Sequence, residues 1–523
     1  MAKENYKELI IKKLIQEKVK NTDDFFNVLR KLSKKSQEIF PTKIELLKAY
    51  RNLVKAGKIK PAPGLENLLK IREVRTLSGI ASITVITKPY PCPGKCIYCP
   101  NEIDMPKSYL ANEPACMRAK LTKFDPYKQV KTRLKALEMT GHPTDKIELI
   151  ILGGSWSAYP KKYQTWFIKK CFDACNEKDS KSLKEAQKLN EKAKHRIVGL
   201  TLETRPDFIT PEEIKRMRKL GCTRVELGVQ SIYDDILALN KRGHNTKSTI
   251  EATRLLKDAG FKITYHIMLN LPGSNPKKDE RMFKELFSNP DFQPDQLKIY
   301  PCVVLKTSPL YKLYKQGKYK PYSKNQLINL LIKIKEKIPP YVRIIRVIRD
   351  IPSQSIIAGN KATNLRQLIL EEMNRQNKKC KCIRCREIKD IKVSNKDIKL
   401  FRKDYPASEG KEIFLSFEDI KKDKIIAFLR LRITDHWTLS CLKNCAIIRE
   451  VHTYGPMVSI AKKNKYAQQH KKLGKQLIQK AEKIVKKETP FRKIAVISGI
   501  GVREYYRKLG YRLKNEYMIK SLS

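Results

Sequence analysis

The chain has 523 residues, and its 110 Lys and Arg against 54 Asp and Glu give a formal net charge of +56 at pH 7. A chain of this length can form two to four domains with sizeable cores, and so large a basic excess is typical of proteins that bind a polyanion such as nucleic acid. No run of 18 apolar residues and no apolar leader segment is found, so we expect a cytoplasmic protein with no membrane-spanning helix.

Residues 1 to about 75 are predicted to form short basic helices. Apolar residues recur at helical spacing in YKELIIKKLIQ, DDFFNVLRKL and KIELLKAYRNLV, and PAPG at 61–64 ends the pattern. One alternative is that these lysines only form the solvent-exposed face of the helices and bind no ligand. The net charge would also be explained by a generally lysine-rich proteome or by binding to a membrane surface. The lysines that we consider for contacts with an RNA backbone are Lys12, Lys13, Lys18 and Lys20.

Residues 76 to about 370 alternate β-branched runs with helical patterns. Runs such as ASITVITK, IELIILGG and KITYHIML alternate about six times with stretches such as PEEIKRMRKLG. Such alternation predicts a parallel sheet, wound either as a barrel or as an open sheet. In parallel barrels the functional side chains lie at the carboxyl ends of the strands. The residues expected there are Gly153, Gly154, Glu203 and Gln230.

Three cysteines follow the first predicted strand in PCPGKCIYCP, with the spacing C-x3-C-x2-C. Three thiolates can hold a cubane iron–sulfur cluster and leave the fourth iron open to another ligand. Pro93 and Gly94 permit the tight turn that lets the sulfur atoms converge. A structural zinc site is the alternative, but it would normally need a fourth Cys or His nearby, and this loop has none. The proposed cluster ligands are Cys92, Cys96 and Cys99.

Residues 371 to about 400 form a polar, basic connector with a second cysteine group in CKCIRC. The spacing C-x-C-x2-C suits a small zinc site that fixes a linker between two domains. The sequence does not identify a fourth ligand, which could be another cysteine, a histidine or water. The proposed zinc ligands are Cys380, Cys382 and Cys385.

Residues 401 to 523 predict antiparallel strands in FLSFED, IIAFLRLRI and AIIREVHTYG, followed by a helix, a strand and a final helix and strand. The stretch QQHKKLGKQLIQKAE resembles the loop of GNAT acetyltransferases, in which the free N–H groups of a helix start bind the pyrophosphate of acetyl-CoA. The family pattern Q/R-x-x-G-x-G/A falls on Gln469, Lys472 and Gly474. Lys472 therefore replaces the first glycine, although its charge could pair with a phosphate.

The resemblance to GNAT enzymes implies further contacts with acetyl-CoA. Tyr506 matches the tyrosine that those enzymes point at the thioester sulfur, and the strand REVHTYG would lie along the pantetheine arm. Glu450 is also a candidate general base. The residues implied for this site are Glu450, Val451, His452, Thr453, Gln469, Lys472, Leu473, Gly474, Lys475 and Tyr506.

The three-cysteine loop ahead of a repeated βα pattern resembles the radical S-adenosylmethionine superfamily. In that superfamily the open iron binds the amino and carboxylate groups of S-adenosylmethionine, and an electron from the 4Fe-4S cluster splits it into methionine and a 5′-deoxyadenosyl radical. Tyr98 matches the aromatic residue of that loop, and Gly153 and Gly154 match a GGE-like turn in which Ser155 replaces the acid. Further candidates for cofactor contacts are Glu203 and Gln230.

One family joins both domains in this order, the catalytic subunit of the Elongator complex, and the chain resembles it over almost its full length. The resemblance lies in EPACMRAKLTKFDPY, LETRPDF, CTRVELGVQSIYDDI and AVISGIGVREYYRKLGYRL. It implies an α/β fold with a partial parallel (β/α)6 barrel and a GNAT domain. The compact spacing of the first two cysteines is similar to that of archaeal or bacterial members.

This resemblance implies an enzyme that acts on the wobble uridine in the anticodon stem-loop of tRNA. A carbon radical formed on the acetyl methyl of acetyl-CoA would add to C5 of the uridine, and thioester hydrolysis would leave 5-carboxymethyluridine. The resemblance also implies that Lys146 contacts acetyl-CoA and that zinc occupies the second cysteine group. Eukaryotic relatives work with other Elongator subunits, but this sequence indicates no partner surface. Two alternatives stay open, a protein (histone) lysine acetyltransferase and a non-catalytic RNA-binding scaffold.

Overall fold

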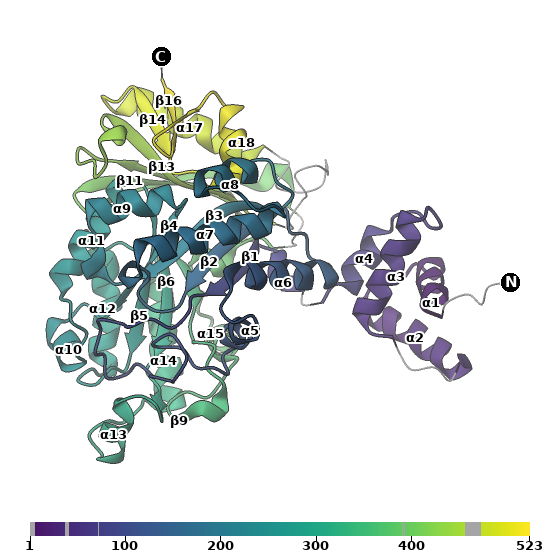
Figure 1. Cartoon of the computed structure of the whole chain (residues 1–523), viewed down its shortest axis with the longest axis horizontal. Coiled ribbons are helices and arrows are strands. Elements are labelled where there is room, and N and C mark those ends of the chain that lie inside the picture. Colours follow the sequence, from purple (N-terminus) through teal and green to yellow (C-terminus); the bar gives the residue numbers. More distant parts are fainter. Residues whose placement is uncertain are drawn as a thin grey trace.

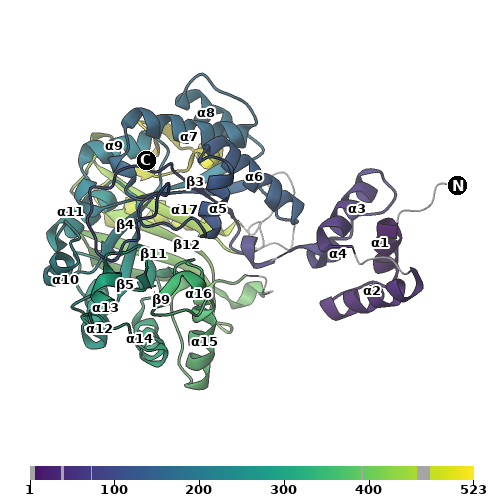
Figure 2. The same cartoon turned by 60° about the horizontal axis from the view of Figure 1, so that its bottom comes forward.

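The computed structural model describes residues 6–36, 41–71, 73–389, 391, 393–455 and 472–522. The chain forms a helical module at the N-terminus, a parallel sheet covered by helices and a mixed sheet at the C-terminus. Figures 1 and 2 show the helical module standing apart from the two sheets, which pack on one another.

The N-terminal module packs around an apolar core of its own. Its third helix begins at a capping box, in which the Thr42 side chain accepts from the Glu45 backbone and the Glu45 side chain accepts from the Thr42 backbone. Arg51 Nη1 donates to the carbonyl of Glu138 on α6 (Pro126–Met139) at 2.7 Å, which links the module to the rest of the chain. The helices of the module are α1 (Tyr6–Gln16), α2 (Thr22–Ser36), α3 (Lys43–Lys55) and α4 (Pro63–Leu69).

The central part is a seven-stranded parallel sheet whose strand order follows the chain, β1-β2-β3-β4-β5-β6-β8. β1 and β8 are the edge strands and are not paired with each other, so the sheet is an open half-barrel and not a closed barrel. This confirms the predicted fold class, and the structure adds one strand to the six expected from the sequence. The strands are β1 (Ala81–Ile86), β2 (Lys146–Leu152), β3 (Arg196–Thr204), β4 (Arg224–Gln230), β5 (Lys262–Leu269), β6 (Gln296–Pro301) and β8 (Arg343–Arg346).

Helices surround the outside of the half-barrel (Figures 1 and 2). Most of the longer ones begin where a polar side chain accepts a hydrogen bond from the helix backbone, and these caps are Asp125, Ser182, Thr210, Asn245, Asn275 and Ser323. The other helices are α5 (Pro114–Leu121), α7 (Lys161–Asn176), α8 (Leu183–Asn190), α9 (Pro211–Lys219), α10 (Asp234–Leu239), α11 (Thr246–Asp258), α12 (Pro276–Ser288), α13 (Leu310–Lys315), α14 (Lys324–Lys337) and α15 (Leu365–Arg375), and a small sheet pairs β7 (Val304–Leu305) with β9 (Ile356–Ala358).

The C-terminal sheet begins as an antiparallel meander of four strands. The fourth strand, β13, pairs in parallel with β14 as far as Ile448 and Val496, where β14 ends, and β13 continues beyond it to Thr453. The elements are α16 (Ile383–Arg386) in the connector, then β10 (Ile398–Ala407), β11 (Gly410–Asp419), β12 (Lys424–Ile433), β13 (Cys445–Thr453), α17 (Leu473–Glu488), β14 (Lys493–Val496), η8 (Ile500–Val502), α18 (Arg503–Arg507), β15 (Arg512–Lys514) and β16 (Tyr517–Ser521).

The C-terminal sheet packs against the amino ends of the half-barrel strands. Arg449 on β13 pairs with Asp295, which directly precedes β6, at 2.5 Å. Arg432 on β12 pairs with Asp258 at the end of α11 at 2.6 Å, and all four side chains are buried. A buried charge pair is costly to break once formed, so these contacts fix the orientation of one sheet on the other. No helix in the described ranges is long and apolar enough to cross a membrane.

Candidate active site

A cavity of about 550 Å³ lies inside the half-barrel. All three cysteines of the first loop line it, and so do Gly154, Glu203 and Gln230 from the carboxyl ends of the strands. The lining continues to Ser82 and Thr84 on β1, so the cavity runs along the lumen toward the end where the C-terminal sheet packs. The structure thus brings together the residues predicted for the cluster and its cofactor.

The cysteine loop is held by arginines that sequence reasoning missed. Arg242 Nη1 donates to Cys96 Sγ at 3.6 Å, while its other nitrogens donate to the carbonyl of Gly228. A hydrogen bond from Cys99 and the charge of Arg242 lower the pKa of the Cys96 thiol to about 5, against the effect of burial. A Cβ on Gly94 would lie 2.7 Å from Arg205 Nη1, so a larger residue at this point of the loop would have to displace the guanidinium.

The turn after β2 also requires glycine. Gly153 has φ +135°, and a Cβ there would lie 1.9 Å from Thr87 Oγ1; Gly154 has φ +95°. The carbonyl of Gly153 accepts hydrogen bonds from Tyr159 Oη at 3.0 Å and from Thr87 Oγ1 at 3.3 Å. The hydrogen-bonded turn therefore presents the backbone of Gly154 to the cavity.

Three buried polar atoms of the cavity lining lack a partner within the described chain. They are the hydroxyl of Tyr98, Oε1 of Gln230, whose backbone is left-handed at φ 68°, and Nη1 of Arg205. Buried polar groups are nearly always hydrogen-bonded, so atoms of this kind in a cavity lining are available to bind a ligand. One acceptor and one cationic donor beside three thiols fit the hydroxyl or amino and carboxylate groups of S-adenosylmethionine at a 4Fe-4S cluster.

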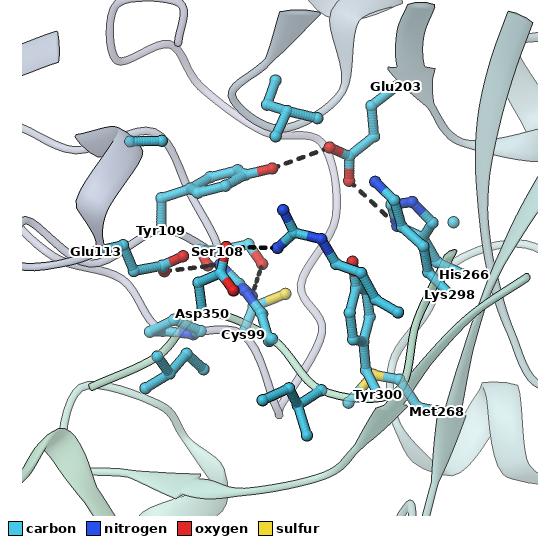
Figure 3. A pocket seen from close by; sticks show the side chains of 18 of the residues that line it. Cys99, Ser108, Tyr109, Glu113, Glu203, His266, Met268, Lys298, Tyr300 and Asp350 are labelled. Atoms are coloured by element: carbon cyan, nitrogen blue, oxygen red, sulfur yellow. Dashed lines mark hydrogen bonds and ion pairs between the residues drawn. The ribbon is translucent and has the colours of Figure 1, made fainter. Parts of the chain in front are cut away.

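A series of charged side chains crosses the lumen below the mouth (Figure 3). Tyr109 Oη donates to Glu203 at 2.9 Å, and the other oxygen of Glu203 lies 3.4 Å from His266 Nδ1. His266 Nε2 lies 2.8 Å from Glu226, which also contacts Lys298. Burial would raise the pKa of Glu226, but the positive charges of Lys298 and His266 keep it well below its usual range.

The series continues to the amino end of the strands. Arg224 lies 3.8 Å from Glu226 and 2.6 Å from Glu148 on β2. The lumen of the half-barrel is therefore polar from its mouth to the C-terminal sheet. The sequence contained one signal for this, the charged residues at alternate positions of predicted strands, where apolar side chains would be usual.

The glycine loop of the C-terminal sheet meets the free end of β13. A Cβ on Gly474 would lie 3.6 Å from Thr453 Oγ1, 3.8 Å from Val451 Cγ1 and 3.6 Å from the hydroxyl of Tyr505. Tyr505 was not predicted, whereas the predicted Tyr506 is buried and packs edge-on against Tyr505 and Tyr511. Tyr505 and Tyr506 both belong to the same short helix, α18.

Lys472 has the backbone of a glycine. Its φ of 58° and ψ of 17° are left-handed, which is the conformation that glycine adopts without strain. The lysine thus adopts a backbone conformation that glycine favours, and its side chain is exposed, as is that of Lys475, while Leu473 is buried. Gln469 lies outside the described residues.

The remaining candidates of this site lie at the junction of the two sheets. Glu450 is buried between Lys262 Nζ at 3.2 Å and Arg430 Nε at 3.0 Å. Burial would raise its pKa, but these two cations lower it to about 2. His452 Nε2 contacts the carbonyl of Ser78, ahead of β1, at 2.9 Å. Lys146 begins β2 at the same end of the half-barrel, and burial lowers its pKa.

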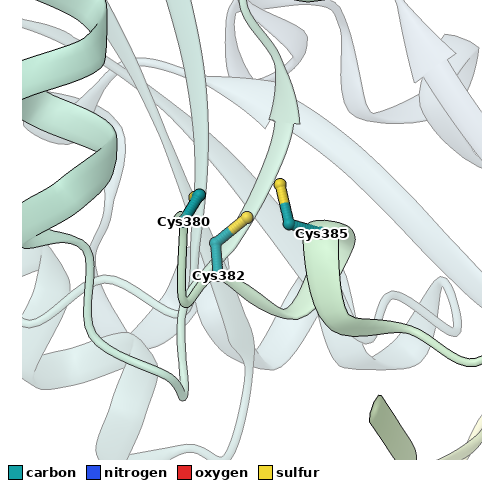
Figure 4. Close-up of side chains that lie close together, drawn as sticks. All are labelled: Cys380, Cys382 and Cys385. Carbon is teal, nitrogen blue, oxygen red and sulfur yellow. The ribbon is translucent and has the colours of Figure 1, made fainter. Parts of the chain in front are cut away.

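The second cysteine group is compact. The Sγ atoms of Cys380, Cys382 and Cys385 all lie within 4.8 Å of one another (Figure 4), and no further His, Cys, Asp or Glu joins them in the described part of the chain. Zinc–sulfur bonds of about 2.3 Å place the thiolates of a tetrahedral site about 3.8 Å apart, so the group fits one ion. Within the described ranges the cysteines of the first loop do not form such a group.

The predicted RNA-binding lysines lie on and after α1, in the separate module. Lys13 contacts Gln16 at 3.2 Å and Glu17 at 3.7 Å. Lys12, Lys18 and Lys20 are exposed. None of the four lines the cavity.

Known proteins are similar to this chain over most of its length. Residues 89–286 match the Radical SAM superfamily, and residues 294–375 match the Radical_SAM C-terminal domain. The chain is 50% identical over 469 residues to the tRNA uridine(34) acetyltransferase of Methanocaldococcus infernus, covering 87% of this chain and 88% of that one. It is 40% identical to Elongator complex protein 3 of Bos taurus, covering 87% and 86%. The solved structure of the archaeal Methanocaldococcus infernus Elp3 with an N-terminal deletion matches with a TM-score of 0.77 and 46% identity, over 85% of this chain and 100% of that one.

Proposed function

The chain belongs to the family of tRNA uridine(34) acetyltransferases and Elongator complex protein 3, and we propose on this premise that it is a radical S-adenosylmethionine enzyme that modifies the wobble uridine of tRNA. The observation that carries the proposal is one cavity that holds three thiols and three unpartnered polar atoms at its mouth and then extends through the half-barrel toward the C-terminal sheet.

The mouth of the cavity is the proposed radical half of the site. Cys92, Cys96 and Cys99 would hold a 4Fe-4S cluster, with the Gly154 backbone, Arg205 and Gln230 around S-adenosylmethionine. When bound, this pair supplies a 5′-deoxyadenosyl radical, which is reactive enough to take hydrogen from an unactivated methyl group. The chain contributes a buried and shielded site, and Arg242 offsets the negative charge that gathers on the thiolates.

The C-terminal sheet is the proposed acetyl-CoA half. Acetyl-CoA would lie beside the part of β13 that continues beyond the end of β14, with its pyrophosphate at the start of α17 and its thioester near Tyr505 and Tyr506. Lys146 and His452 stand between this place and the lumen. We propose that the acetyl methyl becomes the carboxymethyl group at C5 of uridine, which requires the acetyl end to reach the lumen.

Charge supports an RNA substrate. Ten Lys and Arg line the cavity against three Asp and Glu, in a chain with a net charge of +56. A loop nucleotide is unpaired, so its base can turn outward into such a cavity while arginines bind its phosphates. The lysines of the N-terminal module would then hold a more distant part of the same RNA.

The second cysteine group is proposed to bind a structural zinc ion. Its connector joins both sheets, because the Ile383 N–H donates to Val342 ahead of β8 at 2.9 Å and the Ile388 N–H donates to Ile425 on β12 at 3.1 Å. A metal ion here would hold the connector in place between the two halves of the active site.

Two observations weigh against the alternative functions. A lysine acetyltransferase needs a general base, and the buried, doubly paired Glu450 with a pKa of about 2 is poorly suited to accept a proton near neutral pH. The scaffold alternative relied on Lys472 in place of a glycine, and Lys472 adopts a left-handed backbone that glycine would also adopt.

The test is anaerobic reconstitution with iron and sulfide, followed by incubation with dithionite as the electron donor, S-adenosylmethionine, acetyl-CoA and tRNA. We expect 5′-deoxyadenosine and 5-carboxymethyluridine from the wild type and neither from Cys96→Ala. Acetylation of a histone peptide by both proteins, without change to tRNA, would overturn the proposal in favour of a lysine acetyltransferase. Protein that carries zinc in place of iron on Cys92, Cys96 and Cys99 would overturn the radical chemistry itself.

A further inference from the structure

A row of aromatic rings stands beside the cysteine loop. Tyr90 stacks on Tyr159 with ring centroids 4.8 Å apart and an interplanar angle of 30°, and Tyr159 stacks on Tyr163 at 5.3 Å and 21°. Trp166 continues the row in a tilted contact with Tyr163 at 5.6 Å. We call these four residues the aromatic row.

Hydrogen bonds fix the aromatic row to the active site. Tyr159 Oη contacts the carbonyl of Lys88 at 2.7 Å and that of Gly153 at 3.0 Å, so the ring is tied to the loop after β1 and to the glycine turn after β2. Tyr163 Oη accepts from the backbone of Lys88 at 3.1 Å. Tyr90 stands two residues before Cys92, which lines the cavity, so this end of the row lies at the cavity rim.

Both ends of the aromatic row are exposed. Tyr90 is 37% and Trp166 is 43% accessible to solvent, while Tyr159 between them is buried. An exposed ring stacked on a rigid inner ring offers a flat surface at little cost in side-chain entropy, and such surfaces commonly mark binding sites.

The exposed charges of the two segments that build the aromatic row are all positive, whereas Lys169 and Lys170 pair with Asp173 and Asp179. These two segments, residues 88–100 and 153–170, contain six lysines and no Asp or Glu. The exposed ones are Lys88, Lys95, Lys161 and Lys162, and Lys88 Nζ lies 5.2 Å from the centroid of Tyr163. Lysines without acids suit a polyanion better than an apolar or mixed-charge protein surface.

We propose that the aromatic row is a stacking platform for an unpaired base of the RNA substrate, adjacent to the nucleotide that enters the cavity. The base would lie on the ring of Tyr90 while the surrounding lysines bind the neighbouring phosphates. Proteins hold single-stranded RNA in this manner, because every base offers a π-face and the backbone charge is met by Lys and Arg. The inference rests on the proposed function in one respect, that the substrate is RNA.

The test measures binding of a fluorescently labelled anticodon stem-loop RNA to the full-length protein at fixed salt. Loss of one base–aromatic stack predicts that Tyr90→Ala weakens binding by roughly 5- to 150-fold, while Tyr90→Phe stays within about twofold of the wild type. The control is Phe401→Ala, which removes an equally exposed ring on β10 and should not change the affinity. A second measurement places 2-aminopurine beside the target uridine, where the wild type and Tyr90→Phe should change its fluorescence and Tyr90→Ala should not.

The platform would be overturned if Tyr90→Ala bound the RNA as tightly as Phe401→Ala and changed the 2-aminopurine fluorescence as the wild type does. This outcome does not depend on what the enzyme does to tRNA. A wild type that binds the stem-loop through Tyr90 but never modifies it would leave the platform standing and overturn the proposed function. A wild type that does not bind the RNA at all would overturn both.

Discussion

Arg242 donates a hydrogen bond to Cys96 Sγ at 3.6 Å, although the two residues are 146 positions apart in the chain. We predict that Arg242→Gln lowers the yield of 5′-deoxyadenosine by about 10- to 100-fold, the usual effect of losing a group that supports a metal ligand. The reduction potential of the cluster should also shift, because hydrogen bonds to its sulfur atoms tune it. Arg254→Gln, which removes an arginine from the outer helix α11, is the control for charge. Potentiometric EPR checks the shift, and equal potentials in the two variants would contradict the assignment.

Gly153→Ala should damage both stability and the radical half of the site. An L-residue at φ +135° is strained, and its Cβ would lie 1.9 Å from Thr87 Oγ1. We therefore expect the free energy of unfolding to fall by about 1–3 kcal/mol from backbone strain, with a further loss from the clash. Gly64→Ala is the matched control, because nothing lies within 4 Å of the new Cβ there. Urea unfolding of the two variants measures the difference. Equal midpoints would show that the turn can move without cost.

The buried charge of Glu450 predicts a specific dependence on pH. Its pKa is lowered from 4.5 to about 2 in the folded protein, so its ion pairs stabilise the fold above pH 4.5, and this contribution disappears as the pH falls toward 2. The shift corresponds to about 3 kcal/mol near neutral pH. Glu450→Gln should therefore be clearly less stable than the wild type at pH 7, with the difference shrinking below pH 4.5. Urea unfolding of both proteins along a pH series is the measurement, and a gap that stays constant down to pH 3 would be inconsistent with these ion pairs.

The zinc proposal predicts two metals that can be removed separately. Cys382→Ser should lose about one zinc ion per chain and unfold at a lower temperature, because the metal joins the connector to both sheets. The iron content should stay as in the wild type, whereas Cys96→Ala should lose iron and keep zinc. Elemental analysis of anaerobically purified protein decides this. Iron lost from both variants, or zinc from neither, would contradict the assignment of the two cysteine groups.

Local patterns were sufficient for much of the site. The spacing of Cys92, Cys96 and Cys99 and the two glycines after a strand are features of short segments, so their chemistry is readable before the fold is known. The fold class also followed, since alternation of strand and helix patterns fixes a parallel sheet. The seventh strand was missed because RIIR is too short to give a periodic signal.

Residues that act through strand neighbours could not be predicted. His266 and Lys298 stand side by side only because β5 and β6 pair in one register, and the sequence does not state which strands are adjacent. Arg205 is buried near Gly94 for a similar reason. In the C-terminal sheet the sequence did not indicate Tyr505, whose hydroxyl meets Gly474, because the rotation of a helix decides where each of two adjacent side chains points. The role of Tyr506 stays a prediction.

The charged contacts between Arg449 and Asp295 and between Arg432 and Asp258 have a practical consequence for anyone who divides the gene. A truncated product ending near residue 400 would carry two carboxylates evolved for burial, together with an uncovered apolar surface around Gly260. It should aggregate during expression, and the same holds for the isolated C-terminal fragment with its surplus arginines. Each half therefore stabilises the other by covering its buried charges and its apolar surface.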